Sequence, residues 1–416
     1  MVTITRIHHS IVHNAMHRNS IYLMMSTWVM AVLGFFFWMV AARLYAPEQI
    51  GLATTLISAT NLLSFTSLLG LNSGLIRYFP QASSRSDIVT TVFILTGSAG
   101  AALAVLLLVA MELVSPQLAF IRQPVALAIW FVAFMVFSVW NIAIESAFIS
   151  YRATVFVLLK NTVLSLMKVA LPLCFVSRGA TGIFLAISVA TVVAVCASLL
   201  VLVWRFGYRP TLSVNKHALK SMAMFSFGNY AAAILGNMPT MILPLIITNS
   251  LGPASAAHYY MAMMVANFLY IIPVATGQML FAEGSRSGDK LTEKFKRTLR
   301  LTMALMLPAV LCVAVLGKYV LLAFGEEYYR EGLQLLQLLA ISGVAVSLNS
   351  ICGAILNVRG RVWMLVAING VASVLVLALA YLQASTGLTG VGLAWLIGNG
   401  AVVLPLVLAA RTFMSR

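Results

Sequence analysis

The sequence predicts an all-α membrane protein with about twelve transmembrane helices in two six-helix bundles that repeat in parallel orientation. Three observations support this fold class: an apolar composition, an uneven distribution of basic residues and an internal repeat. Hydrophobic residues make up 62% of the 416 residues and charged residues only 9%, with a mean hydropathy of +1.00. Soluble proteins carry about a quarter charged residues, so an ordinary soluble domain is excluded.

Charge and turn signals divide the chain into twelve apolar stretches. Each is long enough to cross a hydrocarbon core of roughly 30 Å as a helix. We expect helices because backbone in lipid must satisfy its own hydrogen bonds, and because the alternating pattern of a barrel is absent. The predicted spans are 21–42, 50–76, 88–112, 124–149, 155–177, 181–204, 221–249, 254–281, 299–324, 333–357, 362–384 and 388–410.

Lys and Arg residues are concentrated on one side of these spans. Twenty of the 26 lie in the termini or in and near the connections that flank the spans on that side, five lie in or near the flanks on the other, and Lys168 lies deep inside a span. Basic connections stay in the cytoplasm, so we predict a multi-pass membrane protein with both termini cytoplasmic. The net charge of +16 therefore indicates topology, and no nucleic-acid partner is expected.

The two predicted halves resemble each other at their beginnings. Ala31–Gly34 is similar to Ala233–Gly236, and Pro47 is matched by Pro253 at nearly the same separation along the chain. Six spans precede the second copy, so both halves enter the membrane in the same direction. The domain boundaries that follow are a cytoplasmic tail (1–20), a first lobe (21–204), a linker (205–220), a second lobe (221–410) and a short cytoplasmic tail (411–416). Parallel repeats are typical of alternating-access transporters with a site near the midplane.

Two ionisable residues stand out inside the spans. Lys168 lies midway along the fifth predicted span, where a charge costs roughly 2.5–3.5 kcal/mol. It is a candidate substrate-binding residue, although snorkelling or pairing with a neighbouring helix would also explain it. Glu145, in the fourth predicted span, is either a carboxylate coupled to a proton or the counter-ion of Lys168 or Arg152.

Other candidates lie nearer the ends of spans or at prolines. Arg43, Arg77 and Asn72 are candidate substrate-binding residues; topology would equally explain the two arginines, and bonding between helices would explain Asn72. Prolines kink membrane helices. We therefore expect the candidate gating positions at Pro172, Pro239 and Pro244.

The connection 283–300 alternates apolar and basic positions at helical spacing. It predicts an interfacial amphipathic helix with Asp289 as its N-cap, facing anionic membrane lipids. The four cysteines lie in apolar spans without close pairing, so neither a disulfide nor a metal site is expected. We expect no catalytic residue and no cofactor, while a coupling proton or sodium ion is left open.

The first predicted hairpin resembles a known family. Ala42–Leu52 and Gly70–Pro80 are similar to polysaccharide-biosynthesis flippases of the multidrug/oligosaccharidyl-lipid/polysaccharide (MOP) exporter superfamily. The resemblance implies a V-shaped pair of six-helix lobes that moves undecaprenyl-diphosphate-linked oligosaccharide to the outer leaflet, for lipopolysaccharide or exopolysaccharide synthesis. It further implies that cations such as Lys168 hold the anionic headgroup, and that a polysaccharide polymerase and glycosyltransferases are partners.

Two alternatives remain open. The first is a drug or small-molecule cation antiporter of the same fold, although the acid that drug-exporting relatives carry in their first span is missing from 21–42. The second is a membrane glycan polymerase or glycosyltransferase. Such an enzyme needs acid/base or metal-binding groups on a sizeable external loop, and the external acids cluster only in the short segment Glu326–Glu331. We therefore expect a transporter rather than an enzyme.

Overall fold

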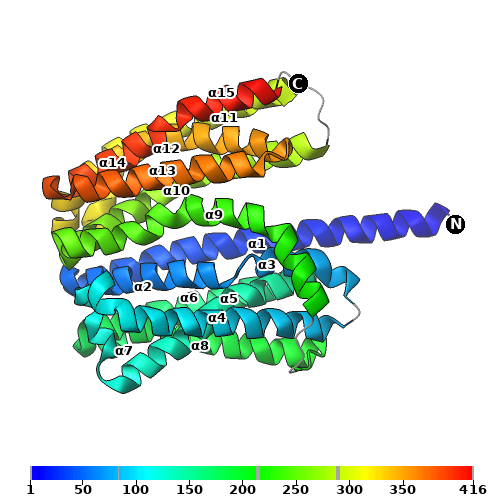
Figure 1. The fold of residues 1–416 in the computed structure, drawn as a ribbon, viewed down its shortest axis with the longest axis horizontal. Coiled ribbons are helices and arrows are strands. Elements are labelled where there is room, and N and C mark those ends of the chain that lie inside the picture. Colours follow the sequence, from blue (N-terminus) through cyan, green and yellow to red (C-terminus); the bar gives the residue numbers. More distant parts are fainter. Residues whose placement is uncertain (1, 83, 212–215, 287–290, 415–416) are drawn as a thin grey trace. The chain divides into compact units, whose positions relative to one another are not determined.

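The computed structural model describes residues 2–82, 84–211, 216–286 and 291–414 of the protein. Side chains are described for 18–82, 84–211, 228, 230–285 and 291–412. Over these residues the chain is a succession of α-helices and short 3-10 turns without a β-strand (Figure 1). The all-helical membrane fold predicted from composition is confirmed.

The chain forms two compact units. The first contains Met1–Leu44, Leu63–Leu113 and Ala119–Phe227, and the second contains Tyr45–Leu62, Val114–Leu118 and Gly228–Arg416. Most of the first six predicted spans belong to the first unit. The beginning of the second span and the short segment after the third belong to the second unit.

The first unit is built from helices that pack side by side. α6 packs against α1 and α8, and α5 packs against α3 and α8. The helices of the unit are α1 (Val2–Leu44), α3 (Leu71–Tyr78), α4 (Arg85–Val114), α5 (Val125–Ser150), α6 (Val155–Ala170), α7 (Pro172–Phe175) and α8 (Gly179–Phe206). The predicted cytoplasmic tail 1–20 is the first part of α1, a single helix that continues into the first span.

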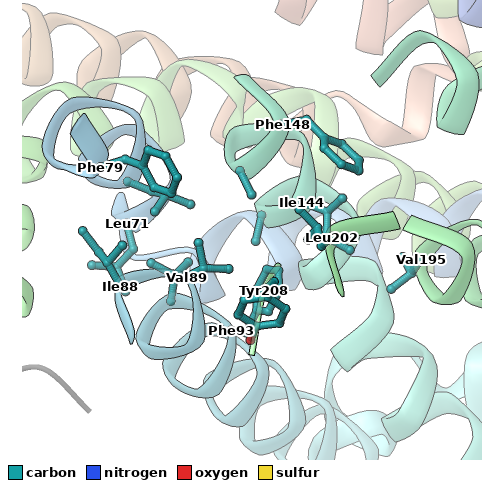
Figure 2. Packing of buried hydrophobic residues seen from close by; sticks show 14 of the residues in the cluster. Leu71, Phe79, Ile88, Val89, Phe93, Ile144, Phe148, Val195, Leu202 and Tyr208 are labelled. Atoms are coloured by element: carbon teal, nitrogen blue, oxygen red, sulfur yellow. The ribbon is translucent and has the colours of Figure 1, made fainter. Parts of the chain in front are cut away.

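A hydrophobic cluster holds one end of this unit together. Leu71 and Phe79, from the α3 region, pack with Phe93 of α4 and Phe148 of α5 (Figure 2). Tyr208, which follows α8, reaches into the cluster and its hydroxyl group lies 2.9 Å from Thr90 Oγ1. The chain that leaves the sixth span is therefore fixed to the start of α4. Further along the same segment, the hydroxyl group of Thr211 donates a hydrogen bond to Asp87 Oδ1 at 2.9 Å.

The second span is not the continuous helix 50–76 that the sequence predicted. It consists of α2 (Pro47–Ser67) and α3, which meet at a bend of 46°. Leu69 and Gly70 have φ values of 50° and 73°, in the left-handed region that ends a helix. The Leu-Gly pair in Leu68–Leu71 therefore breaks a stretch whose apolar composition is uniform.

The described residues contain ten helical segments long and apolar enough to cross a membrane, or up to eleven if the bent pair α2–α3 counts as one span. One of the ten, Val155–Phe206, has 52 residues. At about 1.5 Å per residue it is far longer than a bilayer needs. It folds back on itself, because α6 and α8 pack side by side (Figure 1). Counting this hairpin as two crossings gives the twelve spans expected from the sequence.

The second unit surrounds one central helix. α12 (Glu326–Val358) packs against helices on several sides: α10 (Pro253–Arg286), α11 (Leu291–Phe324), α13 (Val362–Leu382), α14 (Leu388–Ala401) and α15 (Val403–Met414). The part of α9 (Lys216–Leu251) from Gly228 onward also belongs to this unit. Many of the residues that α12 buries are small or aliphatic, including Gly332, Ala340, Gly343 and Gly353, which allows neighbouring backbones to come close.

The beginning of α2 is part of this second unit and lies very close to α10. A Cβ atom at Gly51 would lie 1.7 Å from the carbonyl oxygen of Pro253. Thr55 Oγ1 lies 2.5 Å from Thr248 Oγ1 of α9, and Ser115 Oγ lies 2.8 Å from Asn249 Oδ1. Both α2 and α10 begin at a proline, Pro47 and Pro253, which is favourable at the first position of a helix.

The predicted interfacial helix in 283–300 is wrong as a separate element. α10 continues to Arg286, and Leu291–Arg300 forms the first turns of α11, the ninth span. Leu291 is buried, and Lys294 donates to the carbonyl oxygen of Glu283 at 2.9 Å. Asp289, the predicted N-cap, lies outside the described residues.

Candidate functional site

A polar cluster lies inside the first unit, where α5, α6 and α1 meet. It contains Asn141 and Glu145 from α5, Lys160 and Asn161 from α6, and Ser26 from α1. Such groups are costly in a membrane-spanning region unless they satisfy one another. This cluster is therefore a candidate functional site.

Lys160 is the centre of this cluster. Its ammonium group donates to Glu145 Oε1 at 2.9 Å, to Asn141 Oδ1 at 2.5 Å and to the carbonyl oxygen of Asn141 at 3.1 Å. An ammonium group has three protons, so its donor capacity is fully used. The Lys160 side chain is 1% exposed, whereas that of Glu145 is 32% exposed. The pair is thus closed on the lysine side and accessible on the carboxylate side.

Asn161 connects this ion pair to the first helix. Its Nδ2 atom donates to Glu145 Oε1 at 3.0 Å and to Ser26 Oγ at 2.9 Å. The Oδ1 atom of Asn161 is buried and has no hydrogen-bond partner. The ion pair therefore fixes α1, α5 and α6 to one another.

Lys168 lies eight residues beyond Lys160 on α6, roughly 12 Å along the helix axis. Its side chain is partly buried, and among the described residues we find no hydrogen bond or ion pair to it. Because Glu145 neutralises Lys160, Lys168 supplies the excess positive charge of α6 in the interior of this unit. An unneutralised cation in a membrane span is costly and is usually functional.

The other predicted substrate-binding residues lie elsewhere. Arg43 is exposed at the end of α1. Arg77 is exposed near the end of α3, with its guanidinium carbon 5.8 Å from the centre of the Tyr78 ring. Asn72 is partly buried in the first turn of α3. Their roles stay predictions.

The prolines differ in their effect on their helices. Regular α-helix stops at Ala170 and a new short helix begins at Pro172, two residues later. Pro239 and Pro244 lie within α9, which continues through both. A role for these prolines in gating stays a prediction.

The sequence analysis assigned Lys160 to the basic connections and so missed the partner of Glu145, which is neither Lys168 nor Arg152. The positions of the two residues contain the signal. Glu145 lies five residues before α5 ends at Ser150, and Lys160 lies five residues after α6 begins at Val155. Positions equally far from a tight turn lie opposite each other in a helical hairpin.

A cavity of about 450 Å³ lies within the second unit, surrounded by α9, α10, α12, α13 and α14. Its lining is unusually rich in carboxamides and contains no charged residue. Six of the lining residues are Asn237, Gln278, Asn349, Asn357, Asn369 and Asn399. None of these six residues is among the candidate binding residues predicted from the sequence.

Comparisons with solved structures define the class of fold. The chain is 17% identical to a multidrug resistance MATE family transporter of the MOP superfamily in an inward-facing conformation, with a TM-score of 0.75 over 95% of this chain and 98% of that one. It is 18% identical to a MOP superfamily transporter from Pyrococcus furiosus, with a TM-score of 0.67 over 96% and 95% of the two chains. The fold is therefore that of MOP superfamily transporters.

The sequence also identifies the family. A model of the family described as polysaccharide biosynthesis protein matches residues 40–331, well over half of the chain. The protein belongs to this family, as its first hairpin indicated. No curated protein matches the chain in sequence.

Proposed function

We propose that the protein is a flippase that moves undecaprenyl-diphosphate-linked oligosaccharide across the bacterial inner membrane by alternating access, for surface polysaccharide synthesis. Two findings support a flippase of this family: the match to the polysaccharide biosynthesis proteins and the fold of MOP superfamily transporters. Both termini would be cytoplasmic, and a polymerase and glycosyltransferases would act on the same glycan. No catalytic residue or cofactor is needed for this function.

The observation that carries the proposal is the unpaired cation Lys168 inside the first unit. A diphosphate headgroup is an anion, and a cation without a protein partner can bind it in a region from which water is largely excluded. Lys160 cannot take this role in the structure described, because its three donors are already used. Arg43, Arg77 and Asn72 would contact the substrate as it enters or leaves.

The test is a deletion strain of the source organism that carries Lys168→Ala. A hydrogen bond to a charged group contributes about 1.5–3 kcal/mol, so we expect surface glycan to fall at least roughly tenfold and lipid-linked oligosaccharide to accumulate. Lys168→Arg should restore part of the activity. Lys318→Ala, which removes a lysine from α11 in the second unit, is the matched control. Normal surface glycan in the Lys168→Ala strain, at wild-type protein level, would exclude Lys168 from the mechanism.

A second candidate function is export of drugs or small cations, because several similar structures are MATE transporters. It predicts a deletion strain with altered drug tolerance and unchanged surface polysaccharide. The same strain therefore distinguishes the two functions.

A further inference from the structure

We propose that the amide-lined cavity of the second unit binds the hydroxyl groups of a neutral sugar. The inference rests on the proposed function, since it assigns the sugar part of a lipid-linked oligosaccharide to this cavity. A volume of about 450 Å³ lies within the range of roughly 300–1,000 Å³ typical of small-molecule sites.

The argument begins with two acceptors that lack donors. Asn349 Oδ1 and Asn357 Oδ1 are buried atoms without a hydrogen-bond partner, and both residues line the cavity. A buried polar group without a partner costs about 1–3 kcal/mol. Such groups are rare in native structures and call for an explanation. A ligand that brings hydroxyl donors would satisfy both oxygens after the side-chain amides rotate toward the cavity.

Three side chains of the cavity wall donate hydrogen bonds that join neighbouring helices. Asn349 Nδ2 donates to the carbonyl oxygen of Asn399 at 3.0 Å, joining α12 to α14. Asn369 Nδ2 donates to the carbonyl oxygen of Ala232 at 3.0 Å, joining α13 to α9. Ser350 Oγ donates to the carbonyl oxygen of Pro273 at 2.8 Å, joining α12 to α10. The wall is therefore held in place, and its carboxamides still offer both N–H donors and oxygen acceptors to a ligand.

Among the described residues no charged side chain lines the cavity, and this decides the class of ligand. A diphosphate would find no cation among the described lining residues to neutralise its charge. A cationic drug would lack a carboxylate to neutralise it. A sugar offers several hydroxyl donors and a C–H face, for which the exposed ring of Phe281 supplies an apolar surface.

The test measures binding of synthetic prenyl diphosphates to the purified full-length protein in detergent. The probes are geranylgeranyl diphosphate and its glucose, galactose, N-acetylglucosamine and N-acetylgalactosamine derivatives. We expect at least one sugar derivative to bind five- to tenfold more tightly than the sugar-free compound. Asn349→Ala with Asn357→Ala should remove this preference and leave the affinity for the sugar-free compound unchanged.

Asn357→Ala alone separates a binding role from a structural one. It removes an unsatisfied acceptor, so the melting temperature of the ligand-free variant should equal or exceed that of the wild type while the sugar preference falls. Gln334→Ala is the matched control, because it removes an exposed amide from the same helix outside the cavity. This control should keep the full sugar preference.

The outcomes separate this inference from the proposed function. If the sugar-free compound binds and no derivative binds more tightly, or if the preference survives the double substitution, the cavity is not the sugar site. If none of the five compounds binds, the proposed function is wrong and the inference is overturned with it.

Discussion

Glu145 and Lys160 depend on each other inside the first unit. The lysine is almost completely buried and its charge is compensated by one carboxylate. Replacing both members of such a pair is often nearly neutral, whereas removing one leaves an uncompensated charge that costs about 3–5 kcal/mol. The single and double substitutions of this pair are therefore expected to differ in their effect on the free energy of unfolding.

We predict that Glu145→Gln destabilises the protein by about 3 kcal/mol, because Lys160 keeps its charge and loses its anion. The double variant Glu145→Gln, Lys160→Met should recover most of that loss. Thermal unfolding of the purified protein in detergent measures both. A single variant as stable as the wild type would show that the ion pair does not hold the three helices together.

Some of the residues of the candidate site could be predicted from the sequence. Lys168 and Glu145 stand out because an ionisable residue in an apolar span is rare. Lys160 does not, because a lysine near the end of a span has the ordinary explanation of topology. The amides of the second unit are harder still, since Asn349, Asn357 and Asn399 come together only through the packing of α12 and α14.

At the scale of single elements, α2 and α10 approach each other more closely than side chains normally allow. The contact exists because residue 51 is a glycine: any Cβ would overlap the backbone of Pro253. The first turns of the two helices are therefore in direct backbone contact.

Gly51→Ala should force these turns apart and lower both the melting temperature and transport. Gly34→Ala in α1 is the matched control, because a Cβ there has nothing within 4 Å. Alanine is a better helix former than glycine by up to about 1 kcal/mol, so the control should be neutral or slightly stabilising. Equal stability of the two variants would contradict the close approach. Thermal unfolding and surface glycan level are the two measurements.

Hydropathy predicted the existence of the spans because every apolar stretch of sufficient length has to be helical in lipid. It did not predict the bend between α2 and α3, where Leu69 takes a left-handed conformation that its residue type does not favour. It also mistook the start of α11 for an interfacial helix. The same basic and apolar faces fit either a helix lying on the membrane or the first turns of a span.

At the scale of the whole molecule, the second span contributes to both compact units. Tyr45–Leu62 belongs to the second unit and Leu63–Leu113 to the first. The sequence-predicted boundary at 205–220 follows the repeat and the basic linker. The contacts in the structure instead assign the first part of α2 to the second unit, because Gly51 contacts α10 and Thr55 contacts α9.

A disulfide between positions 55 and 248 tests whether this association opens during transport. The hydroxyl oxygens of Thr55 and Thr248 lie 2.5 Å apart, so cysteine side chains at these two positions would face each other. In a variant whose four native cysteines are replaced, Thr55→Cys with Thr248→Cys should lose transport on oxidation and regain it on reduction. Each single cysteine variant is the control. Full activity of the oxidised double variant would show that α2 and α9 stay together throughout the cycle.

The neutral lining of the cavity in the second unit has a consequence for the conditions under which the protein can work. Carboxamides neither titrate nor attract counter-ions, so the contribution of this cavity to binding does not change with acidity or ionic strength. A contact through Lys168, by contrast, weakens as dissolved ions screen its charge wherever water reaches it. The preference of the cavity for a sugar should therefore persist at salt concentrations that weaken the contact with Lys168.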